Sequence, residues 1–145
     1  MKAVIQRVTR ASVEVSGETV GAIDNGLVIL LGIAKGDTCA HAEYLLNKII
    51  QLRIFEDEAG LFNKSLLDIQ GELLIVSQFT LCADCRKGRR PSFVDAAPTH
   101  EAKQLYDFFL EKAREFKIKV ASGIFQAMML VKIENNGPVT ICLEK

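Results

Sequence analysis

The chain has 145 residues, 49% of them hydrophobic, and its 18 basic and 18 acidic side chains give a formal net charge of zero. That length predicts a single domain, residues 1–145, with one hydrophobic core, and the charge balance excludes a global field that would draw the protein onto nucleic acid or anionic lipid. No apolar run approaches the roughly 20 residues that a membrane-spanning helix needs, and the alternating N-terminus is unlike a secretory leader, so we expect a cytoplasmic protein with no membrane contact.

The first third of the chain alternates apolar and polar residues, which is typical of antiparallel strands with one buried face. We expect strands over residues 3–8, 13–15 and 19–23, with a turn at 16–18. Gly26 opens the run LVILLGIA, and its unbroken apolar character fits a strand that is buried on both faces.

An amphipathic helix is predicted to follow, since Asp37 and Thr38 are good N-cap residues. Its apolar stripe is formed by Ala42, Leu45, Leu46 and Ile49. The acidic stretch at 56–60 predicts a turn, and residues 72–80 predict a strand with an apolar centre.

The segment 81–98 has few periodic apolar residues, two prolines and the basic run RKGRR at 86–90. It predicts a long loop, and long loops inside compact domains are usually functional. A second amphipathic helix is expected over 99–116, and closing strands near 117–122, 129–134 and 139–143. Strands outnumber helices and do not alternate with them regularly. We therefore expect an α+β fold: a curved, largely antiparallel, barrel-like sheet system with two main helices packed outside.

The four cysteines, Cys39, Cys82, Cys85 and Cys142, are expected to be reduced thiols. Cys82 and Cys85 form a CxxC. A structural zinc site would need a second Cys/His pair, and a redox dithiol would normally open a helix in a βαβ unit. An incidental pair is the favoured interpretation, and no metal or cofactor is expected.

The sequence contains no phosphate-binding glycine loop, neither GxxxxGK[ST] nor GxGxxG between a strand and a helix. His41 and His100 are the only histidines and lie far in sequence from any nucleophilic Ser or Cys, which argues against a Ser-His-Asp hydrolase. We expect both to be solvated at the surface.

Two short stretches suggest a site. Residues 77–81, SQFTL, put polar side chains at the end of an apolar strand and in front of the basic loop, where they can meet a ligand. An ordinary strand end is the alternative. Residues 135–140, NNGPVT, predict a turn between two strands, and composition alone favours a plain turn.

Together the two stretches resemble the signature motifs SQFTL and NxGPVT of the D-aminoacyl-tRNA deacylase family. Four further segments are similar to that family in the same order: MKAVIQRVTRASVEV, LRIFEDEAG, SLLDIQGELL and RKGRRPSFVDAAP. The resemblance thus covers essentially the full chain. One stretch departs from it, because SGIFQAMM stands where the family typically has a TGxFGADM-like sequence. Phe125 and Met129 are kept, while Gln126 and Met128 replace a glycine and an acid.

The resemblance implies a homodimer that hydrolyses the ester bond of D-aminoacyl-tRNA without a cofactor, as a form of chiral proofreading. It leaves open whether glycine mischarged on tRNA is also cleared. The implied catalytic residues are Ser77, Gln78, Phe79 and Thr80, and the implied substrate-binding residues are Phe125 and Met129. Gly137 and Pro138 of the second chain, joined by a predicted cis bond, would exclude L-aminoacyl groups. Supporting roles fall to Arg7, which braces that turn, and to Asn135, Val139 and Thr140.

For the chemistry we expect direct attack by water with help from the 2′-hydroxyl of the RNA, because Thr80 as a nucleophile would lack a base in either motif. Backbone N–H groups around Phe79 and Thr80 would polarise the carbonyl. The alternative is a tRNA-binding or redox-responsive module without catalysis, built on the 86–90 loop and the CxxC.

Overall fold

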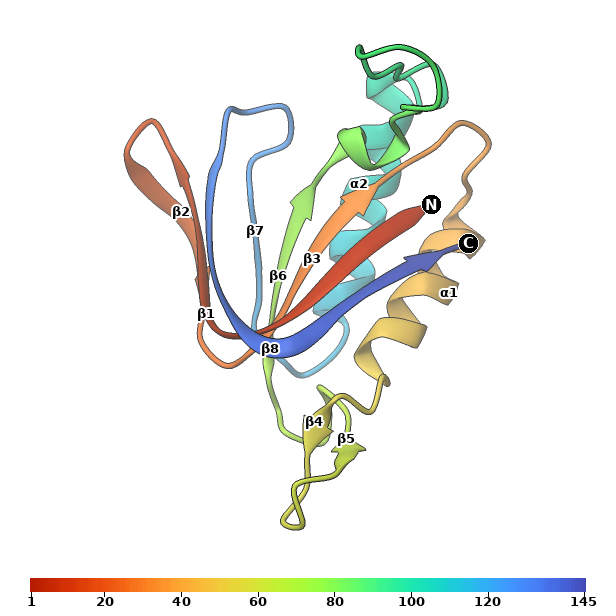
Figure 1. Cartoon of the computed structure of the whole chain (residues 1–145). Coiled ribbons are helices and arrows are strands. Elements are labelled where there is room, and N and C mark those ends of the chain that lie inside the picture. The colour runs from red at the N-terminus through yellow and green to blue at the C-terminus, as the bar shows by residue number, and fades with distance from the viewer.

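The computed structural model describes all residues, 1–145, and shows a curled six-stranded sheet with two helices packed against it and a small separate hairpin (Figure 1). The strands are β1 (Lys2–Val15), β2 (Glu18–Ile23), β3 (Gly26–Gly32), β4 (Phe55–Glu56), β5 (Phe62–Lys64), β6 (Glu72–Ser77), β7 (Val120–Ser122) and β8 (Leu130–Glu144). The helices are α1 (Cys39–Ile50), the 3-10 turn η1 (Phe79–Cys82) and α2 (Thr99–Arg114).

The sheet is mixed, so the expectation of a largely antiparallel system is only partly right. β1 pairs antiparallel with β2, β3 and β8, whereas β3–β6 and β6–β7 are parallel pairs. Parallel neighbours need long crossover connections. The two helices supply them: α1 lies in the chain between β3 and β6, and α2 lies between β6 and β7.

β1 and β8 are each one long strand, where the sequence predicted two shorter pieces. They pair with each other along almost their whole length. Gln6 is opposite Thr140 and Val8 is opposite Asn135, so the four residues 136–139 lie across from the single residue Arg7. Residues 135–140 therefore form a bulge inside β8, and the predicted turn between two strands is wrong. The register shift absorbs the extra residues while pairing continues on both sides.

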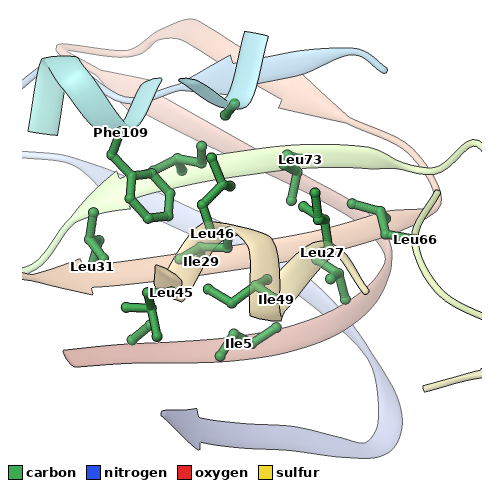
Figure 2. Close-up of a cluster of buried hydrophobic side chains, with 14 of the residues drawn as sticks. Ile5, Leu27, Ile29, Leu31, Leu45, Leu46, Ile49, Leu66, Leu73 and Phe109 are labelled. Atoms are coloured by element: carbon green, nitrogen blue, oxygen red, sulfur yellow. The ribbon is translucent and has the colours of Figure 1, made fainter. Parts of the chain in front are cut away.

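The larger core lies between the sheet and the two helices. Leu45, Leu46 and Ile49 of α1 and Phe109 of α2 point at the sheet residues Ile5, Leu27, Ile29, Leu31 and Leu73 (Figure 2). A second cluster, separate from the first, contains Val28 of β3 and Val8, Val13 and Leu74 of other strands. Side chains of a strand alternate between faces, so β3 is buried on both, as its unbroken apolar run predicted.

The helices begin close to the predicted positions. Thr38 is the N-cap of α1, and its hydroxyl accepts a hydrogen bond from the His41 N–H at 3.4 Å. Asp37 instead accepts from the Ala34 N–H at 2.7 Å and contacts His41 Nδ1 at 3.2 Å. His41 is thus half-buried beside a carboxylate, contrary to expectation, while His100 is exposed as predicted. Neither long helix has the length and apolar character to cross a membrane.

A two-stranded hairpin, β4–β5, was not predicted. It encloses the acidic turn of residues 56–60, where the Asp57 carboxylate accepts from the N–H groups of Ala59 and Leu61, each at 2.9 Å. A hydrogen bond from the Asn63 amide, together with these two backbone bonds, lowers the pKa of Asp57. The hairpin projects from the lower end of the molecule (Figure 1). It contacts Arg7, whose guanidinium lies 3.9 Å from Glu56 Oε1 and 5.0 Å from the centre of the Phe62 ring.

Candidate active site

The SQFTL segment turns away from the sheet instead of continuing as a strand. β6 ends at Ser77, the Gln78 N–H donates to Leu31 O at 2.7 Å, and the chain then forms η1. The prediction of a strand through Thr80 is therefore wrong. A Cβ at Gly32 of β3 would lie 2.9 Å from Leu81 Cβ and 3.0 Å from Gln78 O. The glycine gives η1 the space to fold back against β3.

A pocket of about 650 Å³ opens beside η1. It is lined by Ser77, Gln78, Phe79 and Thr80, by residues 125–129, and by Ala96, Ala97 and the start of α2. The six residues predicted for catalysis and substrate binding, Ser77, Gln78, Phe79, Thr80, Phe125 and Met129, all line this pocket.

The pocket has no titratable side chain. None of its 17 lining residues is a His, Cys, Lys, Arg, Asp or Glu. The Gln78 amide donates a short hydrogen bond to the Thr80 hydroxyl. Thr80 therefore has an amide as its partner rather than a base that could remove its proton. The N–H groups of Phe79 and Thr80 precede the first hydrogen bond of the turn, from Leu81 N–H to Gln78 O, so neither has a partner within η1.

Two aromatic rings line the pocket, one of them exposed and the other half-buried. Phe79 is 58% exposed and meets Phe93 edge-on, with 5.0 Å between ring centroids. Phe125 is half-buried and packs on Tyr106, with centroids 5.6 Å apart. The Tyr106 hydroxyl donates to Ile75 O at 2.8 Å, and burial raises the pKa of this phenol, so it stays a donor. Tyr106 thus packs against the Phe125 ring. Its place in the apolar stripe of α2 predicted burial but not this contact.

The bulge of β8 is held by side chains from β1 and from β8 itself. The Arg7 guanidinium donates to Asn136 O at 3.2 Å and to Gly137 O at 3.3 Å, which is the contact expected of a brace. The Asn135 amide donates to Arg7 O at 2.8 Å and to Val139 O at 3.2 Å. Thr140 Oγ1 accepts from the Gln6 amide at 3.2 Å. The Gly137–Pro138 peptide bond is cis, as predicted.

The bulge and the pocket are separate within one chain. None of residues 135–140 lines the pocket. Gly137 and Pro138 are exposed, Val139 is buried, and a Cβ at Gly137 would meet no atom within 4 Å. The structure therefore brings the predicted residues into two groups, and the functional roles assigned to both groups stay predictions.

The basic loop and the cysteine pair lie next to η1. Arg86 Nε and Nη2 donate to the two Asp84 carboxylate oxygens at 2.9 and 2.8 Å, which lowers the pKa of Asp84. Lys87 and its neighbouring arginines 89 and 90 are exposed. Cys82 is buried, Cys85 is exposed, and both are free thiols lining a second hollow of about 490 Å³. No three His, Cys, Asp or Glu side chains are grouped to hold a metal ion.

Comparison with known proteins identifies the family. The family model described as D-Tyr-tRNA(Tyr) deacylase matches residues 4–144. The D-aminoacyl-tRNA deacylase of Geotalea uraniireducens (strain Rf4) is 60% identical over 144 residues, covering 99% of this chain and 93% of the relative. That of Thermosipho melanesiensis is 57% identical over 145 residues, covering 99% and 97%.

Two solved structures have a similar fold. The c-Myc DNA Unwinding Element Binding Protein superposes with a TM-score of 0.95 at 49% identity, covering 100% of this chain and 99% of the other. A probable eukaryotic D-amino acid tRNA deacylase has a TM-score of 0.81 at 18% identity, covering 98% and 97%, and shares the fold. The sequence matches confirm the resemblance read from the motifs, and the chain belongs to the D-Tyr-tRNA(Tyr) deacylase family of hydrolases.

Proposed function

We propose that the protein hydrolyses the ester bond of D-aminoacyl-tRNA in the cytoplasm and releases the free D-amino acid and tRNA. Relatives about 60% identical over nearly the whole chain carry this activity in their names. The observation that carries the proposal is a pocket that the SQFTL motif lines together with Phe125 and Met129, and in which no lining side chain is ionisable. An aminoacyl ester is already activated, so such a pocket has to bind and select rather than supply a strong base.

In the proposed mechanism, water attacks the ester carbonyl and the 3′-oxygen of the RNA leaves with a proton. The neighbouring 2′-hydroxyl of the substrate positions or activates the water, because the pocket offers no protein base. The N–H groups of Phe79 and Thr80 donate hydrogen bonds to the carbonyl oxygen and stabilise the negative charge that develops on it. The Thr80 hydroxyl, already bonded to Gln78, positions the reactants and does not attack.

Two measurements test this mechanism. A substrate with a 2′-deoxy terminal adenosine should lose about 100-fold to 10,000-fold in kcat, the usual contribution of general acid–base catalysis. Thr80→Val keeps the shape of the side chain and removes the hydroxyl, and it should lower kcat by less than about tenfold, the worth of one neutral hydrogen bond. A covalent aminoacyl-Thr80 adduct, or normal turnover of the 2′-deoxy substrate, would contradict the mechanism.

Selection for the D-configuration is proposed to come from the β8 bulge of a second chain. Gly137 and Pro138 are exposed and lie outside the pocket of their own chain. In a two-fold symmetric dimer each bulge would enter the pocket of the partner. A rigid backbone held by Arg7 would exclude an L-side chain by contact. Because glycine has no side chain to exclude, the same filter predicts that glycyl-tRNA is also hydrolysed.

Gly137→Ala tests the filter without disturbing the fold. The added methyl group has open space in its own chain, so the melting temperature should not change. In the partner's pocket the same methyl group would crowd the substrate, and kcat/KM for D-Tyr-tRNA should fall by about tenfold or more. Unchanged kcat/KM would refute the placement of the bulge, and so would a wild type that hydrolyses L-Tyr-tRNA as readily as D-Tyr-tRNA.

Subunit complementation tests whether the two groups meet across chains. Phe79→Asp places a charge on the pocket wall at an exposed position, so this variant should fold and be inactive. Mixed with Gly137→Ala chains, it should form dimers in which one intact pocket receives one intact bulge, and part of the activity should return. Failure to recover activity in mixed dimers would place both groups in the site of a single chain.

A further inference from the structure

Gln126 combines an unusual backbone with a place in the pocket. Its φ is +66°, in the left-handed region that side chains rarely adopt, and it shares this property with only two other non-glycine residues, Ser16 and Gln70. Those two lie in turns outside the pocket, whereas Gln126 lines it. Strained backbone kept at a binding surface points to a function for the residue that holds it.

The Gln126 amide is free to bind a ligand. The side chain is exposed, and it takes part in no hydrogen bond within the chain, in contrast to Gln78, whose amide is used by Thr80. Its neighbour in sequence, Phe125, lines the same pocket with an aromatic ring that Tyr106 supports. The pocket lining therefore contains an amide and an aromatic ring from two consecutive residues, together with the SQFTL residues.

We infer that Gln126 binds the terminal adenine of the aminoacylated RNA, accepting a hydrogen bond from the N6 amino group and donating one to an adjacent ring nitrogen. The inference rests on the proposed function, since it assigns a contact to the same substrate. A glutamine amide presents a donor and an acceptor at the spacing that adenine offers. Proteins bind the exposed bases of single-stranded RNA by pairing such edge contacts with an aromatic surface, which is the combination found here.

The substrate that tests the inference carries purine in place of the terminal adenine and so lacks the N6 amino group. On this substrate the wild type should lose about fivefold to tenfold in kcat/KM, the lower end of what one bidentate amide contact contributes. Gln126→Gly should lose a similar factor on the normal substrate and should be indifferent to the purine replacement. Gln126→Ala should show the same loss in kcat/KM and the same indifference to the purine replacement, because it also removes the amide. It keeps a side chain on the strained backbone, so the loss cannot come from a change in backbone strain.

Gln70→Gly is the matched control. It replaces the same residue type at a similar positive φ, 50°, outside the pocket. Both glycine variants should raise the melting temperature, because glycine adopts this backbone freely, and only Gln126→Gly should change kcat/KM. If the amide instead contacted the amino acid, the loss in Gln126→Gly would vary between D-Tyr and D-Ala substrates and would not depend on N6, which would overturn the inference.

A binding measurement separates this inference from the proposed function. A non-hydrolysable analogue, with an amide in place of the aminoacyl ester, is titrated in both base forms against the wild type and Gln126→Gly. If the wild type fails to deacylate but its affinity still depends on N6 and on Gln126, the proposed function fails and the contact stands. If the wild type deacylates and both proteins lose the same factor on the purine substrate, the contact is refuted and the function stands.

Discussion

Replacing Arg7 with methionine should destabilise the protein and release the β8 bulge. The Arg7 side chain is 4% exposed, and its guanidinium donates to Ile54 O at 2.6 Å as well as to Asn136 O and Gly137 O. Methionine keeps a flexible apolar stem, so the substitution removes hydrogen-bond donors while leaving most of the packing in place.

The size of the effect depends on which carbonyl groups can regain water. Asn136 and Gly137 are exposed, so their carbonyls rehydrate at little cost. The bond to Ile54 is buried, and a hydrogen bond from a charged donor contributes about 1.5–3 kcal/mol. The guanidinium also lies 5.0 Å from the centre of the Phe62 ring, which adds about 0.5–1 kcal/mol. The free energy of unfolding should therefore fall by about 2–4 kcal/mol, and the Tm by about 4–16 °C.

Thermal unfolding followed by circular dichroism measures the loss, and kcat/KM for D-Tyr-tRNA measures the consequence for the site. Arg10→Met is the control, because Arg10 lies on the same strand and is exposed; its Tm should stay within about 2 °C of the wild type. Arg7→Met should lose kcat/KM even at temperatures where it is fully folded. A wild-type Tm for Arg7→Met, or full activity in the folded variant, would refute the reasoning.

Three further predictions concern the surface and the assembly. Lys87→Ala and Arg89→Ala should each weaken tRNA binding and flatten the slope of log affinity against log salt by about 0.7–0.9, whereas Arg86→Ala should change the slope less because a carboxylate already neutralises Arg86; equal slopes in all variants would assign the loop to the fold. Iodoacetamide should modify exposed Cys85 before Cys82, because Cys82 is buried and burial raises the pKa of its thiol; peptide mass spectrometry gives the order, and equal rates would contradict it. Sedimentation should show a dimer as the active species, and a fully active monomer would refute the shared site.

Local pattern predicted the elements whose burial is decided by near neighbours. The unbroken run of β3 and the apolar stripe of α1 are both in the core, and Thr38 caps α1. The direction in which strands pair was harder to predict, because it depends on the segment that connects neighbouring strands. The parallel pairing of β3, β6 and β7 follows from two helical crossovers, and the alternation of residues within a strand carries no record of it.

For the pocket, the sequence predicted which residues come together but not the conformation of their backbone. All six predicted pocket residues line one cavity, yet Thr80 lies in a 3-10 turn because Gly32, on another strand, leaves room for it. The pairing of Arg86 with Asp84 also escaped prediction, because a run of basic residues is expected to face solvent. The support of Phe125 by Tyr106 was hidden because apolar periodicity indicates burial and not which ring a buried residue touches.

The way in which the bulge is held bears on the proposal that it acts in a second chain. Every hydrogen bond described for it comes from β1 or from β8: Arg7 on two carbonyls, Asn135 on two more, and Gln6 on Thr140. None comes from the pocket of the same chain. Its shape is therefore set independently of the pocket that it is proposed to enter. A steric filter needs this independence, because a wall that relaxed around the substrate would admit both configurations.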